Sequence, residues 1–338
     1  MNNTMRPAFL PCTDATRLGL GGAALGNLYQ VVPEAQVQEL LQGAWQDGCR
    51  SFDTAPHYGH GRSEQRVGLG LKSKPRLEFK LSSKVGRLLT ADAQSPSEQH
   101  GYVDTLPFRQ HWDFTATGIR QSVTESLERL GLDRLDAVFI HDMDALTQGE
   151  NAEAVFKLVL EQALPELHAL QSQGLVTHIG LGVNDHTIVE RLLAHADLDA
   201  LLLAGRYTLL DTSALPSLMP LLAKRGVQVS LGGVFNSGIL ASRVDASREL
   251  TFNYTPAQAQ WVQKALAIQA VCDRHAVPIQ AAALQFALHH PAVHLVWLGA
   301  RSLAEWHQAR EAARLTIPTT LWAELKHLQL LDTEAPTP

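Results

Sequence analysis

Ser51–Glu64 reads SFDTAPHYGHGRSE, and this stretch contains the repeating unit of the fold: a strand, a turn and a helix. Its apolar start predicts a buried strand, its Gly and Pro residues predict a turn, and a helix is expected from about Ser63. Similar apolar runs recur along the chain. We expect eight strands, over Leu18–Leu25, Arg50–Ala55, Phe79–Val85, Ala137–His141, His178–Val183, Ala200–Ala204, Val227–Gly232 and His294–Gly299.

Segments with helical spacing of apolar residues separate these runs. We expect helices over Glu34–Trp45, Thr117–Leu130, Ala152–Gln171, His186–His195, Ala214–Lys224, Pro278–His289 and Leu303–Arg314. The strand runs are apolar throughout, which is typical of parallel strands covered on both faces. Eight such strands, each followed by a helix, predict an α/β fold, the closed (β/α)8 TIM barrel, with an open doubly wound sheet as the alternative. We expect one barrel domain over residues 1–331 and a frayed tail over 332–338.

Two connections are longer than ordinary loops between a strand and a helix. Gly86–Phe114 follows the third expected strand, and Asn236–Tyr254 follows the seventh. Both leave the carboxyl end of a strand, the face on which barrel enzymes build their active sites. They carry aromatic side chains and an arginine, which suit the apolar face and the hydroxyls of a sugar. We therefore expect these two loops to determine substrate choice.

The composition narrows the class of protein. The 338 residues are 45% hydrophobic and carry a net charge of −6, so a large core is expected and nucleic-acid binding gains no support. No run approaches the about 18 apolar residues of a membrane span, and MNNTMRPAFLPC at the start lacks the features of a signal peptide. Cys12, Cys49 and Cys272 are far apart, which predicts reduced thiols in a cytoplasmic protein rather than a disulfide framework or a zinc ribbon.

Four chemically complementary side chains fall at the ends of three successive expected strands. Asp53 ends the second strand, Tyr58 follows on its loop, Lys84 ends the third and His141 ends the fourth. A tyrosine with a pKa of about 10 exchanges protons poorly at neutral pH, but a neighbouring ammonium lowers that pKa. We expect Lys84 to do so, Asp53 to orient Lys84, and neutral His141 to donate a hydrogen bond to the reacting oxygen. This set suits proton transfer while another agent handles a hydride.

The residues around these four resemble a known family. GCRSFDTAPHYGHGRSEQRVG, over residues 48–68, is similar to the active-site signature of aldo-keto reductases, and Lys84 in SSKVGR and His141 in FIHD fall where that family carries its catalytic Lys and His. The likeness continues through IGLGV and LGARS. LLAGRYTLLD, GGVFNSGIL and the His-Asp pair 141–142 are similar to the aldose 1-dehydrogenase branch.

The resemblance implies a (β/α)8 barrel with Asp53, Tyr58, Lys84 and His141 as the catalytic residues. It implies substrate contacts from His57, Arg87, Trp112 and His141. It implies cofactor contacts from Gly22, Ala23, Asp53, Asn184, Gly232, Gly233, Phe235, Asn236, Gly238, Leu240, Gly299, Arg301, Ser302 and His307. Two positions depart from the family pattern: the usual Ser-Asn after the fifth strand reads Gly182-Val183-Asn184, and a Gln common at the end of the sixth strand is replaced by Ala204.

The activity implied is that of an aldose 1-dehydrogenase, which oxidises the anomeric carbon of an L-fucose- or L-galactose-like sugar to a lactone with NAD or NADP. NAD is favoured, because Arg301 stands alone where a 2′-phosphate needs more than one cation and His307 replaces a second Arg. Reduction of small aldehydes or ketones and oxidation of pyridoxal are the alternatives on the same site. A small-molecule substrate and a monomer or small homo-oligomer are expected.

Other readings of these residues are weaker. GLGGAA over residues 19–24 fits a loose Rossmann fingerprint, but no helix opens on its last residues. His57, His60 and His141 could suggest zinc, but they lack the spacing of metal ligands on a helix, so no metal is expected. A regulatory barrel that binds the cofactor without turnover, and a hydrolase or isomerase using Asp53 and His141, remain as rival functions.

Overall fold

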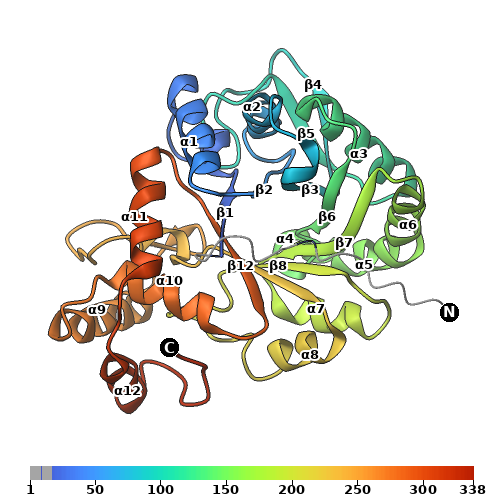
Figure 1. Cartoon of the computed structure of the whole chain (residues 1–338). Helices are drawn as coiled ribbons and strands as arrows, with labels where there is room; N and C mark the ends of the chain where they lie inside the picture. Colours follow the sequence, from blue (N-terminus) through green and yellow to red (C-terminus); the bar gives the residue numbers. More distant parts are fainter. Residues whose placement is uncertain (1–8, 10–16) are drawn as a thin grey trace.

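The computed structural model describes Phe9 and residues 17–338 and shows a closed barrel of eight parallel strands (Figure 1). Around the barrel the order is β1-β12-β9-β8-β7-β6-β3-β2. The strands are β1 Leu18–Gly21, β2 Ser51–Asp53, β3 Lys80–Val85, β6 Leu135–His141, β7 Val176–Val183, β8 Ala200–Ala204, β9 Gln228–Gly232 and β12 Val293–Leu298. The predicted (β/α)8 barrel is confirmed, and each of the eight expected strands has its counterpart.

Helices surround the barrel and connect its strands (Figure 1). They are α1 Glu34–Gln46, α2 Arg62–Leu71, α3 Ala116–Leu130, α4 Ala145–Gln148, α5 Ala152–Leu158, α6 Leu164–Ser172, α7 His186–Leu193, α8 Leu218–Arg225, α9 Ala259–Arg274, α10 Ile279–His289, α11 Leu303–Arg314 and α12 Thr319–His327. The single helix expected over Ala152–Gln171 instead has a π-helical turn, η4 Val159–Ala163, between α5 and α6.

Helix α3 shows how the sequence sets these bounds. The Thr115 hydroxyl accepts a hydrogen bond from the amide of Gly118 at 3.1 Å, which satisfies a donor that the first turn leaves free. Gly131 follows the helix with φ +64°, a conformation that glycine adopts without strain. Between them Ile119 and Val123 are fully buried against the barrel. The cap, the glycine and the buried side chains together determine where the helix begins, ends and packs.

The two long connections contain hairpins rather than irregular loops. β4 Arg87–Ala91 pairs antiparallel with β5 Phe108–Trp112, and β10 Thr251–Phe252 pairs with β11 Thr255–Pro256. Gly86 makes the first hairpin possible: its φ is +103°, and an added Cβ would lie 2.4 Å from the Phe114 ring. The chain can thus turn sharply out of β3 and place Arg87 and Trp112 opposite each other at the rim.

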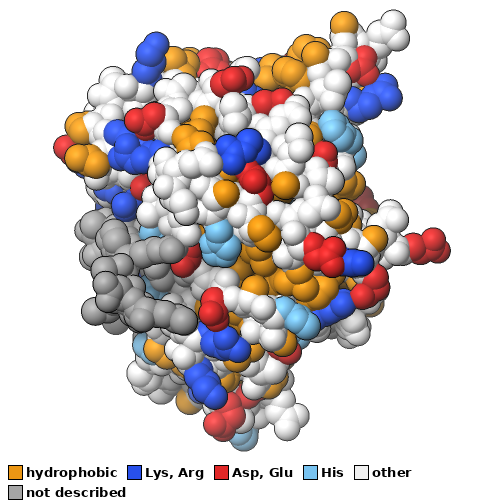
Figure 2. All heavy atoms as spheres, turned by 90° about the vertical axis from the view of Figure 1, so that its right-hand side faces the viewer, with side chains coloured by type: hydrophobic (Ala, Val, Ile, Leu, Met, Phe, Trp, Pro, Cys, Tyr) orange, Lys and Arg blue, Asp and Glu red, His pale blue; other side chains and the backbone are white. Residues whose placement is uncertain are grey.

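The surface and the termini bear on several expectations. On the face shown in Figure 2, Lys and Arg side chains are interspersed with Asp and Glu. Within the described residues no helix is both long and apolar enough to cross a membrane. Cys49 and Cys272 are buried free thiols, whereas Cys12 lies outside the described residues. Ala335, in the segment expected to be frayed, is buried and packs against the core.

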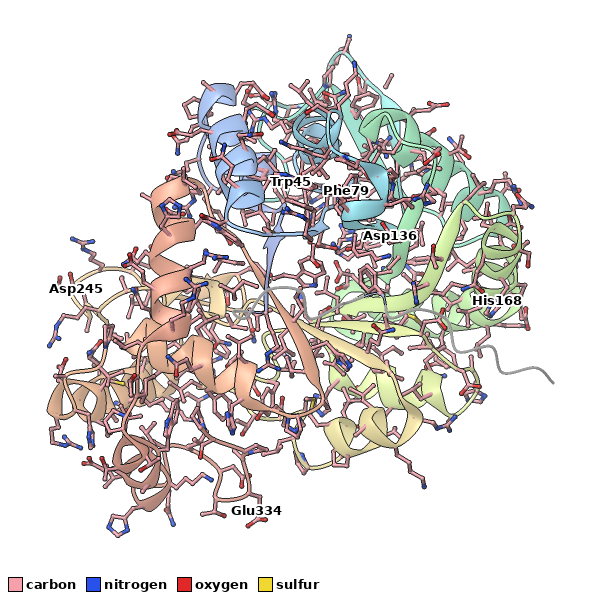
Figure 3. All side chains as sticks on the ribbon, viewed as in Figure 1. Trp45, Phe79, Asp136, His168, Asp245 and Glu334 are labelled. Atoms are coloured by element: carbon pink, nitrogen blue, oxygen red, sulfur yellow. The ribbon has the colours of Figure 1, made fainter. Side chains whose placement is uncertain are left out.

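The amino end of the barrel is held by a buried charge cluster around Asp136 near the start of β6 (Figure 3). Its carboxylate accepts hydrogen bonds from Arg76 at 2.7 Å, from Lys80 at 3.4 Å and from the backbone amide of Leu81 at 2.9 Å. Close by, the Trp45 and Phe79 rings meet edge to face with centroids 6.3 Å apart. These contacts join α1, β3 and β6 at the end of the barrel opposite to the carboxyl-terminal rim.

We predict that Asp136→Ala lowers the free energy of unfolding by about 3 kcal/mol, because it leaves a largely buried arginine without its partner. Urea denaturation measures this. The control is Asp133→Ala: Asp133 is 78% exposed and pairs with Arg134, so its loss should cost less than about 1 kcal/mol. Equal losses in the two variants would show that the cluster does not stabilise the barrel.

Candidate active site

A cavity of about 440 Å³ opens at the carboxyl ends of the strands. At one end Tyr58 and Asp53 line it, and Trp297 contributes an indole from β12. From there it passes Gly22 and Gly233 and reaches Arg301 beside α11. One continuous cavity is thus bordered by Tyr58 near β2 and by Arg301 beside α11.

The base of the site is a buried ion pair. The Lys84 ammonium lies 2.6 Å from the Asp53 carboxylate and also donates to the carbonyl of Thr54 at 2.9 Å. Asp53 accepts a further hydrogen bond from the Ser82 hydroxyl at 2.7 Å. Burial raises the pKa of Asp53, while the charge of Lys84 and the hydrogen bonds from Lys84 and Ser82 lower it. Neighbouring strands β2 and β3 supply both partners, so the barrel itself sets the geometry.

Tyr58 and His141 meet above this pair. The Lys84 ammonium lies 4.7 Å from the centroid of the Tyr58 ring, and the His141 ring lies 6.2 Å from it at 86°. His141 ends β6 and is buried. Burial, together with the positive charges of Arg87 and Lys84 and the nearby ring of His57, holds the pKa of His141 well below its usual value. His141 is therefore a neutral imidazole at physiological pH.

The expected lowering of the Tyr58 pKa by Lys84 is wrong. Burial raises the pKa of Tyr58 well above its usual value, and the negative charges of Asp53 and Asp142 are among the groups that raise it further. Arg87 is the cation that lowers it. The physical reason is that the charge of Lys84 is balanced by Asp53 at contact distance. Tyr58 is thus held as the protonated phenol.

A second group of side chains adjoins Tyr58. Arg87 lies over the face of Trp112 with its guanidinium carbon 3.9 Å from the ring centroid, and it forms a 2.7 Å ion pair with Asp142. Nδ1 of His57 donates to the side-chain oxygen of Gln110 at 2.9 Å, and the His57 ring centroid lies 5.9 Å from that of His141. The structure thus brings the four expected substrate contacts, His57, Arg87, Trp112 and His141, into one cluster.

Six glycines line the cavity, and they let a dinucleotide lie close against the backbone: Gly21, Gly22, Gly232, Gly233, Gly238 and Gly299. At Gly238 and Gly299 an added Cβ would meet nothing within 4 Å, so a side chain there would project into open space that the structure keeps clear. Close approach of the backbone to a ligand is a use of glycine. Of the expected cofactor contacts, Gly22, Ala23, Asp53, Gly232, Gly233, Phe235, Gly238, Gly299 and Arg301 line the cavity.

The other expected cofactor contacts do not line it. Asn184 directly follows β7, Asn236 points its amide nitrogen at the carbonyl of Gly205, and Leu240 is fully buried. Ser302 caps α11 by accepting a hydrogen bond from the amide of Glu305 at 3.2 Å. His307 turns away and lies 2.9 Å from Asp47, since it stands on a different side of α11 from the residues that face the cavity.

Sequence reasoning missed Tyr29, Tyr102 and Trp297, whereas Tyr254 belongs to the Asn236–Tyr254 connection that was expected to meet the substrate. Tyr29, Tyr254 and Trp297 line the cavity, and the Tyr102 ring lies 6.1 Å from that of Tyr58. The backbone amide of Tyr254 donates to the Ser237 hydroxyl at 2.9 Å, and this residue has a φ of +63°. No sequence motif marks these tyrosines, since loops far apart in the chain bring them together. Within the described residues no His, Cys, Asp and Glu group is arranged to hold a metal ion.

Comparison with known proteins agrees with this geometry. The model of the Aldo/keto reductase family matches residues 17–329. The chain is 38% identical to a D-threo-aldose 1-dehydrogenase from Pseudomonas sp. over 323 residues, which cover 94% of each protein. It is 37% identical to a pyridoxal 4-dehydrogenase from Microbacterium luteolum over 331 residues, which cover 94% of this chain and 95% of that protein.

A solved structure supports the fold. The glycerol dehydrogenase of Gluconobacter oxydans superposes with a TM-score of 0.73 at 20% identity, covering all of this chain and 98% of the other. The barrel, the cavity at its carboxyl end and the match over almost the whole chain agree with one another. The chain belongs to the aldo/keto reductase family and is an NAD(P)-dependent oxidoreductase.

Proposed function

We propose that the enzyme oxidises the anomeric carbon of a free aldose, of the L-fucose or L-galactose type, to the lactone. One observation carries this proposal: the cavity ends at Tyr58, beside a cluster of His57, His141, Arg87 and Trp112 that combines an aromatic face with neutral and paired polar groups. Such a surface suits an uncharged, polyhydroxylated ring. The similarity to a D-threo-aldose 1-dehydrogenase supports the same substrate class.

The chain's own groups have distinct roles in this proposal. A nicotinamide cofactor in the cavity supplies hydride acceptance or donation. Tyr58 holds the proton exchanged with the anomeric hydroxyl, and neutral His141 donates a hydrogen bond to the same oxygen. The ion pair between Lys84 and Asp53 fixes both side chains and places the Lys84 ammonium beside the Tyr58 ring. The two hairpins β4–β5 and β10–β11 border the substrate end through Arg87, Trp112 and Tyr254.

Pyridoxal oxidation is the second candidate, because the chain is almost as similar to a pyridoxal 4-dehydrogenase. Pyridoxal is a planar aromatic ring and would use the exposed ring of Tyr254 for stacking, whereas a sugar needs the polar groups. A panel of free aldoses, pyridoxal and small aldehydes, assayed at 340 nm with NAD and NADP and with the reduced cofactors, separates the candidates. The proposal requires an aldose to give the highest kcat/KM.

We predict that Tyr58→Phe lowers kcat by about 10²–10⁴ and leaves cofactor affinity unchanged, because the ring stays and only the proton-carrying hydroxyl is lost. Quenching of tryptophan fluorescence by NADH measures the affinity, since Trp297 lines the cavity. Tyr207→Phe is the matched control: Tyr207 is a buried tyrosine stacked on Phe286, away from the site, and its hydroxyl makes no hydrogen bond within the described residues. If Tyr58→Phe keeps more than about a tenth of the activity, Tyr58 does not carry the proton.

The raised pKa of Tyr58 predicts a pH dependence. Oxidation consumes the phenolate, which becomes scarcer as the pH falls below the pKa, while reduction consumes the phenol, which is present throughout. We therefore expect log kcat/KM for aldose oxidation to rise by about one per pH unit through neutral and mildly alkaline pH, and that for aldehyde reduction to stay flat. Initial rates across that range measure both. A plateau of the oxidation profile at neutral pH would contradict the assignment.

We further propose that NAD is preferred over NADP. Among the described residues that line the cavity, Arg301 is the only one with a Lys or Arg side chain. The Glu305 carboxylate lies beside it and accepts a hydrogen bond from the Arg301 backbone amide at 2.8 Å. Two basic side chains farther along α11 face elsewhere: His307 lies 2.9 Å and Arg310 3.9 Å from Asp47. A 2′-phosphate would meet one cation and one carboxylate, whereas the 2′-hydroxyl of NAD can donate to a carboxylate.

We predict that Glu305→Gln raises kcat/KM for NADP relative to NAD by a few-fold, since one exposed charge contributes about 1 kcal/mol. Glu311→Gln, an exposed carboxylate on the same helix that does not line the cavity, should leave the ratio unchanged. Steady-state kinetics with both cofactors on one substrate measure the ratio. A wild-type preference for NADP of more than about tenfold would refute the proposed preference.

A further inference from the structure

Asp142, the residue after His141, has an unusual backbone. Its φ is +46°, in the left-handed region that costs energy for a residue other than glycine. Two hydrogen bonds hold it there: its amide donates to the carbonyl of Gly182 at 3.0 Å, and its carbonyl accepts from the buried Gln148 side chain at 2.8 Å. The chain therefore keeps this conformation through contacts from two other elements.

The conformation places a carboxylate at the site. The Asp142 carboxylate is largely buried, lies 2.7 Å from the Arg87 guanidinium and 3.4 Å from Nε2 of His141. Glycine or asparagine would adopt this backbone at less cost, so the conformation alone does not call for an aspartate. The contact with Arg87 does, because only a carboxylate supplies the negative charge that neutralises the guanidinium 2.7 Å away.

Both neighbours of the carboxylate retain unused polar atoms. Within the described residues, Nε of Arg87 and Nδ1 of His141 are buried and have no hydrogen-bond partner. Arg87 is held on its other side by the face of Trp112. Asp142 and Trp112 thus clamp the guanidinium from two directions, at the end of the cavity where Tyr58 lies.

We propose that Asp142 is a positioning residue of the active site: its carboxylate holds Arg87 against Trp112 and keeps the imidazole of His141 in the form with hydrogen on Nε2. The proposal rests on the proposed function insofar as Tyr58 and His141 handle the substrate oxygen. A carboxylate next to Nε2 stabilises a proton there, and this N–H is the donor that the reacting oxygen requires. Asp142 acts through these two side chains and need not touch the substrate.

The charges around Tyr58 give the proposal a measurable consequence. Tyr58 is faced by Asp53 from β2, Lys84 from β3, Arg87 from β4 and Asp142 after β6, and by the neutral side chains His57, His141, Tyr102 and Tyr254. Asp144, further along the same loop, and Lys84 also act on Asp142. Removing the charge of Asp142 takes away one anion and leaves the cation of Arg87 unbalanced. Both changes favour the phenolate, so the pKa of Tyr58 must fall.

The test is Asp142→Asn, which is nearly isosteric and suits a left-handed backbone. We expect the oxidation profile to level off about one pH unit lower than in the wild type, because removal of a nearby anion shifts a pKa by that order. We expect KM for the sugar to rise and kcat to fall by about tenfold or more, comparable to the loss of a residue that orients a catalytic group. Nitrogen-15 spectra of the histidine rings, with His141→Gln to assign the signals, should show His141 losing its Nε2–H preference.

Asp144→Asn is the matched control. Asp144 loses the same charge two residues away, and asparagine still caps α4 through the amide of Thr147. This variant should keep the pH profile and the His141 signals of the wild type. If Asp142→Asn also keeps both, the proposal is wrong.

The ring spectra need no substrate, and the pH profile is measured on whichever sugar or aldehyde the wild type turns over. A wild type that oxidises no aldose would therefore refute the proposed function, while the spectra and the profile on an aldehyde would still decide the role of Asp142. An unchanged His141 spectrum in an enzyme that oxidises aldoses would have the opposite meaning: the function would stand and the positioning role would fall.

Discussion

The buried ion pair between Lys84 and Asp53 is the interaction on which the site depends. Two charges with almost no exposure are kept in place by contact with each other at 2.6 Å, by the carbonyl of Thr54 and by the hydroxyl of Ser82. Breaking such a pair leaves an isolated buried charge, at a cost of about 3–5 kcal/mol. The parallel pairing of β2 with β3 sets Asp53 opposite Ser82 and brings Lys84, two residues farther along β3, within reach of the carboxylate. The geometry of the site therefore depends on the pairing of the barrel strands.

This pair also explains the electrostatics above it. Because Lys84 is neutralised at contact, the phenol of Tyr58 senses burial and nearby carboxylates more than the ammonium beneath it. His141 and His57 remain neutral for a related reason, since burial and the Arg87 cation disfavour their protonation. The site therefore presents a protonated phenol and neutral imidazoles as hydrogen-bond donors. A protonated phenol is ready for reduction of a carbonyl, and oxidation by the same residues gains from alkaline pH.

Much of the fold could be predicted from the sequence because parallel barrel strands are buried on both faces. Ala137–His141 is apolar enough to be predicted from the sequence alone, and it lies within β6. The hairpins were missed because Phe108–Trp112 is polar and partly exposed, and because the Asn253-Tyr254 turn adopts positive φ without a glycine. The motif around Asp53 and Tyr58 identified the residues that gather at the rim, but no motif could reveal how burial would shift the pKa of Tyr58.

The cofactor wall shows the same limit. Position along the chain suggested His307, but the side of α11 that faces the cavity carries Glu305, Gln308, Ala309 and Ala312, which follow helical spacing.

The central claim, hydride removal from the anomeric carbon of an aldose, can be tested directly with the best aldose of the panel deuterated at C1. After turnover with NAD, mass spectrometry of the recovered reduced cofactor should show one deuterium gained per lactone formed. Deuterium kept in the sugar product or released to water would contradict the account.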